Sequence, residues 1–367
     1  MDRKDEIIKL QMDVIQEMTN TNLKRLADDL WGMPTLEAGG TPVTKETSGA
    51  AAPKQEQAQQ KPEEKEEPPE NIEDLKKELA GYIGLDTVKR EVESLINLVT
   101  VQKLRRENNL PVNDLSLHMV FSGNPGTGKT MIARLMARIY KSLGILSKGQ
   151  LVEVDRGGLV AGYVGQTAIK TGEAIQKAMG GVLCIDEAYA LTNHGENDYG
   201  QEAVDTLLKA MEDHRDDLVV IVAGYTELME EFVHSNPGLE SRFNRFLEFP
   251  DYTVEEMLGI FDMRCEKSGY TLAPEARDLL KGVLALLSLD VKGFGNARGV
   301  RNLFERAVSA QANRLARLEN VTRDQLMQLT CEDIRAASGA EEAAEKKPAA
   351  EKPAEEPPQE LPIPSDQ

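Results

Sequence analysis

Residues 123–130 form a glycine-rich stretch whose residue types and spacing suit phosphate binding. They read GNPGTGKT and match the pattern Gly-x-x-x-x-Gly-Lys-Ser/Thr. In such a stretch the backbone N–H groups turn toward phosphate oxygens, and the positive end of the following helix adds to the attraction. Lys129 is expected to reach the β- and γ-phosphates, and the hydroxyl of Thr130 is expected to bind Mg²⁺. We assign nucleotide contact to Gly123, Asn124, Pro125, Gly126, Thr127, Gly128, Lys129, Thr130 and Met131.

The residues on either side of this stretch supply the elements that it needs. Met119–Phe121 is a short apolar run, which predicts a buried strand. Apolar residues then recur at helical spacing, at Ile132, Leu135, Met136 and Ile139. A strand before the loop and a helix after it distinguish a phosphate-binding loop from a chance glycine-rich turn. The sequence therefore predicts a nucleotide-binding site.

A second apolar run ends in two acidic residues, Asp186 and Glu187. A carboxylate at the carboxyl end of a parallel strand faces the same crevice as a phosphate-binding loop. Asp186 is therefore a candidate ligand of Mg²⁺, and Glu187 is a candidate base that orients and deprotonates the attacking water. An Asp-Glu pair after a strand is by itself more often a solvated loop, but beside the phosphate loop the catalytic interpretation is favoured.

Composition narrows the class of protein. The chain has 367 residues, of which 40% are hydrophobic, and this is enough for more than one domain. A net charge of −19 argues against nucleic-acid binding, which depends on Lys and Arg. No apolar run approaches the roughly 18 residues of a membrane span, and the N-terminus lacks a signal-peptide core. The three cysteines show no metal-binding spacing. From these features together we expect a cytoplasmic protein without a membrane partner.

Hydrophobic patterning divides the chain into segments. Strands alternate with helices up to residue 250, which predicts an α/β domain with a mostly parallel sheet covered on both faces. The pattern is then helical only, which predicts a small all-α domain. The expected segments are 1–34 (short amphipathic helices), 35–71 (a disordered linker), 72–250 (the α/β domain), 251–337 (the helical domain) and 338–367 (a disordered acidic tail).

The N-terminal segment leaves two interpretations open. Ile8, Met12 and Ile15 fall on one helical face, and a second group of leucines follows. Such a face can dock on its own domain or on a sister subunit, or it can bind a partner protein. Periodicity predicts the face but not its occupant, so we weigh these alternatives equally.

The phosphate loop and the acidic pair together resemble the Walker A and Walker B motifs of an AAA+ ATPase. The likeness extends to one subfamily, which contains CbbX, the red-type Rubisco activase, and SpoVK, the stage V sporulation protein K. It covers about Leu75 to Ala337. The segments that carry it include IDEAY at 185–189, AGY at 223–225, SNPG at 235–238, FPDY at 249–252 and NAR at 296–298.

The resemblance implies roles for further residues. Members of this group work as ring hexamers with each ATP at a subunit boundary, so a homo-oligomer is expected. Arg242 matches the arginine-finger region, with Arg245 as the alternative finger or a second one. Arg298 matches the sensor-2 arginine of the helical lid, and Ile83 and Gly84 match the pocket beside the adenine. Tyr225 stands where classical AAA proteins carry a sensor-1 Asn, although Ala-Gly-Tyr is usual in this subfamily.

Tyr163 resembles the aromatic pore-loop residue that grips a substrate chain in the central channel of the ring. It stands between Gly162 and Gly165, in a stretch where relatives usually have a glycine at the position of Ala161. The alternative is a tyrosine that anchors the loop on its own domain.

The resemblance therefore implies an ATP-driven protein-remodelling motor with an unknown protein client. The Rubisco large subunit is one alternative client. A nucleotide-gated scaffold that recruits partners through the N-terminal helices is the alternative from a different class.

Overall fold

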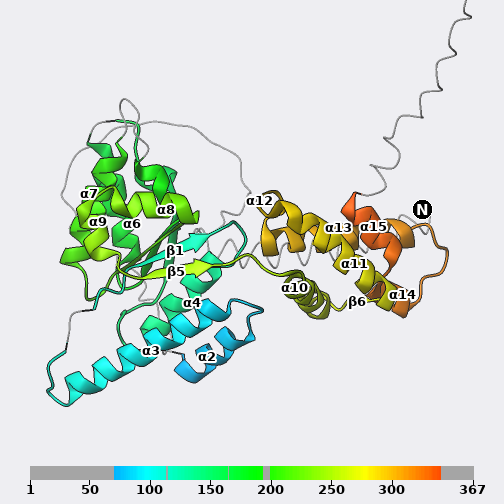
Figure 1. Cartoon of the computed structure of the whole chain (residues 1–367), viewed down its shortest axis with the longest axis horizontal. Helices are drawn as coiled ribbons and strands as arrows, with labels where there is room; N and C mark the ends of the chain where they lie inside the picture. The colour runs from blue at the N-terminus through cyan, green and yellow to red at the C-terminus, as the bar shows by residue number, and fades with distance from the viewer. Residues whose placement is uncertain (1–69, 113–114, 164, 193–198, 340–367) are drawn as a thin grey trace, which may run out of the picture. The chain divides into compact units, whose positions relative to one another are not determined.

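The computed structural model describes residues 70–112, 115–163, 165–192 and 199–339. The expected N-terminal helices lie outside these ranges, as do nearly all of the expected linker and the expected acidic tail. The described residues form an α/β part followed by a helical part (Figure 1).

The α/β part is built on a five-stranded parallel sheet in the order β2-β3-β4-β1-β5. The bounds of the strands are β1 Met119–Gly123, β2 Leu151–Val154, β3 Val182–Ile185, β4 Val219–Gly224 and β5 Phe246–Phe249. Parallel strands buried on both faces are continuous apolar runs, and all residues of β1, β3 and β4 are buried. The sheet is therefore the parallel one that the sequence predicts.

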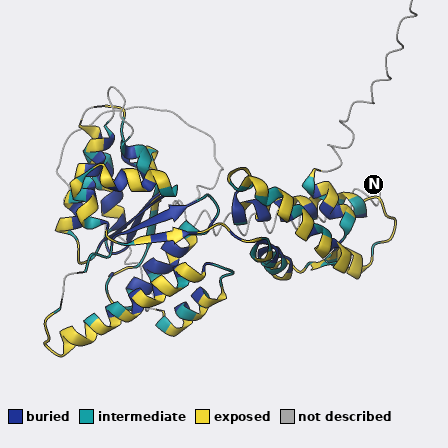
Figure 2. Cartoon of the chain, in the orientation of Figure 1, coloured by how far each residue is buried: buried dark blue, intermediate teal, exposed yellow. Residues whose placement is uncertain are grey.

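Successive apolar side chains of β1, β3 and β4 enter two different hydrophobic clusters. In β1, Met119 and Phe121 pack with the helices that flank the sheet on one side, and Val120 packs with those on the other. The first cluster involves α2 Ile72–Gly81, α3 Asp86–Glu107 and α4 Lys129–Ser142. The second involves α6 Gln166–Ala178, α7 Gly200–Asp213, α8 Thr226–His234 and α9 Pro237–Arg242. Figure 2 shows buried strands between these helices, whose outward faces are exposed.

The strand order brings the functional segments together. β4 lies between β3 and β1, so the carboxyl ends of these three strands are neighbours. The phosphate loop follows β1, Asp186 and Glu187 follow β3, and Tyr225 follows β4. Residues far apart in the sequence thus meet at one edge of the sheet, as the rule for open α/β sheets requires.

The part that follows Asp251 is helical, as predicted, with one small addition. Its helices are α10 Val254–Lys267, α11 Pro274–Leu287, α12 Val291–Phe294, α13 Asn296–Leu315, α14 Arg323–Met327 and α15 Cys331–Ser338. Two strands of two residues each, β6 Thr271–Leu272 and β7 Gln328–Leu329, pair in parallel between them. Runs this short have no alternating pattern, so periodicity gave no sign of them.

Candidate active site

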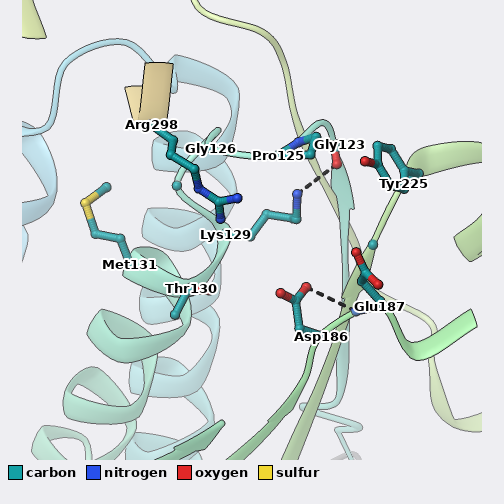
Figure 3. Close-up of a pocket in the computed structure, with 12 residues that line it drawn as sticks. Gly123, Pro125, Gly126, Lys129, Thr130, Met131, Asp186, Glu187, Tyr225 and Arg298 are labelled. Carbon is teal, nitrogen blue, oxygen red and sulfur yellow. Dashed lines mark hydrogen bonds between the residues drawn. The ribbon is translucent and has the colours of Figure 1, made fainter. Parts of the chain in front are cut away.

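A cavity of about 420 Å³ opens at the carboxyl ends of β1, β3 and β4 (Figure 3). It collects residues from the phosphate loop, the acidic pair, the end of β4 and the helical part. The residues that line it are Gly123, Pro125, Gly126, Gly128, Lys129, Thr130, Met131, Asp186, Glu187, Gly224, Tyr225 and Arg298. Sequence-predicted residues from three separate segments therefore share one cavity.

The glycines of the loop adopt conformations that other residues rarely tolerate. The φ angles of Gly126 and Gly128 are +74° and +98°. A Cβ atom on Gly126 would lie 2.1 Å from the carbonyl oxygen of Gly295. The turn of the loop thus depends on glycine for its backbone angles and, at Gly126, also for space.

Lys129 begins α4, and its ammonium group is held within the loop. Its Nζ donates hydrogen bonds to the carbonyl oxygens of Gly123 at 2.8 Å and Asn124 at 2.9 Å. Burial lowers the pKa of Lys129 from its usual value, and the nearby carboxylate of Asp186 opposes that shift. The ammonium group of Lys129 therefore lies at the cavity, where it can attract an anion.

The acidic pair has an unusual backbone. Glu187 has a φ of +49°, in the left-handed region that residues other than glycine and asparagine seldom occupy. Its N–H group donates to the carboxylate of Asp186 at 3.1 Å, and both side chains are exposed to the cavity. Figure 3 shows Asp186 between Thr130 and Glu187. This sharp turn directs two adjacent carboxylates to different parts of one cavity.

The cavity can receive a phosphate chain and a cation. Lys129 and Arg298 supply positive charge, and the hydroxyl of Thr130 and the carboxylate of Asp186 supply oxygen ligands. Within the described ranges, no group of three or more His, Cys, Asp or Glu is arranged to hold a metal ion. Mg²⁺ at nucleotide sites needs few protein ligands, because phosphate oxygens and water complete its shell. The donor set therefore fits Mg²⁺ brought by a nucleotide.

Tyr225, which stands at the sensor-1 position of the sequence, lines the cavity. Its ring lies 6.2 Å from the ring of Tyr189, and the ammonium group of Lys292 lies 5.9 Å from its centroid. A tyrosine after a buried strand is a common sequence feature. Only the position of β4 between β3 and β1 shows that this residue reaches the cavity.

Two predicted contact residues of the loop point elsewhere. Asn124 donates from its side-chain amide to the carboxylate of Asp251, at 3.0 and 2.9 Å. Thr127 is fully buried, and its hydroxyl donates to the carbonyl oxygen of Asn124 at 2.8 Å. Neither is among the residues that line the cavity. Their side chains hold the loop in shape.

Ile83 and Gly84 also lie outside the cavity lining. The side chain of Ile83 lies beside Gly259 of α10, and Gly84 lies against Glu256 and Tyr252. Gly84 has a φ of +63°, and a Cβ atom there would come within 2.3 Å of the Glu256 carboxylate. Their role beside an adenine ring stays a prediction.

Arg242 and Arg245 do not line the cavity of their own chain. Arg242 ends α9 and pairs with the exposed carboxylate of Glu212 at 3.1 Å. Arg245 donates from Nε to the carbonyl oxygen of Ser116 at 3.2 Å. Both arginines therefore lie apart from the residues that would bind phosphate in the same subunit.

Tyr163 lies in a loop between α5 Arg156–Leu159 and α6, away from the cavity lining. We call residues 160–163 and 165 the Tyr163 loop. The side chain of Tyr163 is 73% exposed. Cβ atoms built on Gly162 and Gly165 would meet nothing within 4 Å. The tyrosine is thus presented to solvent.

The sequence matches known proteins over both parts of the structure. Residues 119–251 match the ATPase family associated with various cellular activities (AAA), and residues 253–344 match the AAA lid domain. Stage V sporulation protein K of Bacillus subtilis (strain 168) is 40% identical over 265 residues, which cover 72% of this chain and 82% of that protein. Protein CbbX of Cereibacter sphaeroides is 45% identical over 271 residues, which cover 73% and 86%.

A third relative is the chloroplastic ribulose bisphosphate carboxylase/oxygenase activase of Cyanidioschyzon merolae (strain NIES-3377 / 10D). It is 44% identical over 268 residues, which cover 72% of this chain and 90% of that protein. Among solved structures, the AAA domain of FIGL-1 in complex with ADP has a TM-score of 0.50 at 16% identity, covering 71% of this chain and 83% of that chain. That likeness concerns the fold alone. By its motifs, its two matched domains and these relatives, the chain belongs to the AAA family of ATPases, in the group that contains CbbX and stage V sporulation protein K.

Proposed function

We propose that this ATPase forms a hexameric ring and remodels a protein client by drawing a segment of it through a central pore with Tyr163. The observation that carries the proposal is a large, exposed aromatic side chain between two glycines that have open space around them. An exposed ring of this kind can pack on many different side chains of a passing peptide. A tyrosine that anchored its own loop would be buried instead.

The base of the Tyr163 loop supports this role, because it is attached to α6. Thr167 accepts a hydrogen bond from the N–H group of Ala161 at 3.0 Å, and the hydroxyl of Thr171 donates to the carbonyl oxygen of Leu159 at 3.1 Å. Lys170 donates to the carbonyl oxygen of Val160 at 3.2 Å. Movement of α6 would therefore be passed to the loop that carries the ring.

The two arginines support an active site that is shared between subunits. Arg242 lies apart from its own cavity, and its partly buried guanidinium pairs with the exposed carboxylate of Glu212 and donates to the carbonyl oxygen of Gly238. Because the Glu212 carboxylate is exposed to solvent, a phosphate of a neighbouring subunit would compete with it for Arg242. We propose Arg242 as the arginine finger and keep Arg245 as the alternative.

In this proposal the nucleotide brings Mg²⁺, with Thr130 and Asp186 as its protein ligands. The ion supplies neutralisation of charge on the β- and γ-phosphates. Glu187 orients and deprotonates the attacking water, and Lys129 binds the phosphates. Arg298 links the nucleotide to the lid. We also propose a cytoplasmic location, which rests on the three well-separated cysteines.

The ring is tested by mixing two variants that are inactive for different reasons. Lys129→Ala removes a group that binds phosphate, and Arg242→Ala removes the proposed finger. In a ring with shared sites, equal mixing restores about a quarter of the ATPase rate, because one site in four combines an intact loop with an intact finger. An activity no greater than the sum of the separate variants contradicts the ring. The same mixture with Arg245→Ala decides between the two arginines.

The pulling step is tested with Tyr163→Ala and, as the matched control, Tyr163→Phe. The client is a fluorescent protein with an unstructured C-terminal tail, and the readout is its ATP-dependent loss of fluorescence. We expect Tyr163→Ala to lose this activity while its basal ATPase rate is kept, and Tyr163→Phe to keep both. Unchanged remodelling in Tyr163→Ala would remove Tyr163 from the mechanism and favour a nucleotide-gated scaffold.

The relatives support a protein client but not its identity. One of them is named as an activase of ribulose bisphosphate carboxylase/oxygenase, so the large subunit of that enzyme is one alternative client. The test is recovery of carboxylase activity from the inhibited enzyme with ATP, with Glu187→Gln as the control. Recovery equal to that with Glu187→Gln would exclude this client.

A further inference from the structure

The phosphate loop is held by hydrogen bonds from residues that do not line the cavity. Three consecutive carbonyl groups of the loop accept hydrogen bonds from residues between 252 and 297, in the first half of the helical part. The amide of Asn296 donates from Nδ2 to the oxygen of Pro125 at 3.2 Å. The N–H group of Ala297 donates to Gly126 at 3.2 Å, and the hydroxyl of Tyr252 donates to Thr127 at 3.3 Å. We propose that Asn296 and Tyr252 are positioning residues that orient the phosphate-binding N–H groups of the loop.

The argument rests on the geometry of the peptide bond. In a planar trans peptide, the C=O of one residue and the N–H of the next point in opposite directions, and no described peptide is cis. Fixing the carbonyl groups of residues 125–127 therefore fixes the N–H groups of Gly126, Thr127 and Gly128. Among the described residues, these three N–H groups donate no backbone hydrogen bond, so they are available to phosphate oxygens.

Asn296 is itself held in a single arrangement. It is fully buried, and its φ of +51° lies in the left-handed region. Its Oδ1 accepts from the N–H group of Tyr252 at 3.0 Å, and its Nδ2 also donates to Asp251 at 2.9 Å. An asparagine in this strained conformation persists where several contacts determine it together. These contacts use both amide hydrogens and the side-chain oxygen of Asn296.

A second, independent observation shows how close the lid lies to the loop. The Cβ atom that Gly126 lacks would stand 2.1 Å from the carbonyl oxygen of Gly295 and 3.1 Å from the nitrogen of Arg298. The two backbones are therefore in contact without an intervening side chain. Displacement of the lid would pull on the carbonyl groups and disorder the N–H groups behind them.

This assignment differs from that of a residue that touches the nucleotide. Asn296 and Tyr252 act through the backbone of the loop, whereas Arg298 reaches the cavity with its own side chain. By thermodynamic reciprocity, a nucleotide that needs the oriented N–H groups also favours the lid position that orients them. The affinity for nucleotide and the position of the lid are thus coupled, independently of Arg298.

The test measures binding of ADP with Mg²⁺ to the full chain by calorimetry. Asn296→Gly keeps the favoured backbone angle but removes the amide, and we expect the dissociation constant for ADP to rise about tenfold. Tyr252→Phe keeps the ring and removes one hydrogen bond, and we expect a rise of about threefold to fivefold. The KM for ATP should rise by similar factors with kcat changed much less, because the side chains of Glu187 and Arg298 are intact.

Asn302→Gly is the matched control, because it places the same change at an exposed position of the same helix, α13. It should lower the melting temperature and leave the affinity for ADP unchanged. An affinity for ADP within twofold of the wild type in both Asn296→Gly and Tyr252→Phe would overturn the proposal. Equal losses of affinity in Asn296→Gly and Asn302→Gly would also overturn it, since they would show a general loss of stability. If Asn296→Gly does not fold, Tyr252→Phe alone decides.

Discussion

Two glycine-containing loops of this ATPase lie in opposite environments. In the phosphate loop, Cβ atoms on Gly123 and Gly126 would come within 2.3 and 2.1 Å of backbone oxygens of other segments. In the Tyr163 loop, Cβ atoms on Gly162 and Gly165 would meet nothing within 4 Å. The same residue type thus serves close backbone packing in one loop and open space in the other.

The difference suits two tasks, binding of phosphate in one loop and the proposed contact of Tyr163 with a client peptide in the other. A site for phosphate needs N–H groups in fixed directions before the ligand arrives, because ordering them during binding would lower affinity. A residue that grips varied peptides needs a fixed attachment but an adaptable tip. The Tyr163 loop has that division, since its base is attached to Thr167 and Thr171 while its glycines are exposed.

The largest expected effect is that of Gly126→Ala. The new Cβ atom would collide with the carbonyl oxygen of Gly295, and the φ of +74° would be strained. Together these effects should lower the free energy of unfolding by about 3 kcal/mol. Chemical denaturation checks the stability, and calorimetry with ADP should show binding weakened beyond detection.

The matched control is Gly282→Ala in α11, where a Cβ atom meets nothing within 4 Å. Alanine favours the helix, so this variant should be more stable than the wild type by up to about 1 kcal/mol. If Gly126→Ala were as stable as Gly282→Ala and still bound ADP, the phosphate loop would not be more tightly packed than the Tyr163 loop.

A smaller effect is expected for Thr167→Val, which detaches the base of the Tyr163 loop. Valine fills the same buried space but cannot accept the hydrogen bond from the N–H group of Ala161. Loss of that bond should lower the free energy of unfolding by about 1–2 kcal/mol. Hydrogen exchange should become faster at residues 159–163 and remain unchanged at residues 123–130.

Thr206→Val provides the comparison for this variant. The hydroxyl of Thr206 donates to the carbonyl oxygen of Glu202 within α7, a contact that contributes little to helix stability. Its effect should stay below about 0.5 kcal/mol. Faster exchange throughout α6 in Thr167→Val would show that the helix, not the loop base, had been loosened.

Local motifs explain why much of the site could be predicted from the sequence. The phosphate loop and the acidic pair each lie within a few residues of a recognisable strand, so pattern and chemistry coincide. The parallel sheet follows for the same reason, because β1, β3 and β4 are continuous apolar runs. β5 has a weaker local signal: its residues alternate between exposed and buried at the edge of the sheet, but three of its four residues, FLEF, are apolar and do not alternate with polar ones.

The contacts that were missed join segments distant in the sequence. Asn124, Asp251 and Asn296 form one hydrogen-bonded group, although more than a hundred residues separate the first two. No periodicity or motif links such positions. The left-handed backbone of Glu187 also has no local signal, since glutamate rarely adopts it. These features follow from tertiary packing.

The smallest effects distinguish space from backbone strain within the Tyr163 loop. Gly165 has a φ of +77°, whereas Gly162 has no such angle, and neither has a neighbour that a methyl group would touch. Gly165→Ala should therefore lower the free energy of unfolding by about 1 kcal/mol, and Gly162→Ala should change it by less than about 0.5 kcal/mol. Denaturation with urea measures both, and the difference between them isolates the cost of the left-handed angle. A loss at Gly162 as large as that at Gly165 would mean that the tip of the loop is packed in solution, and the contrast with the phosphate loop would then fail.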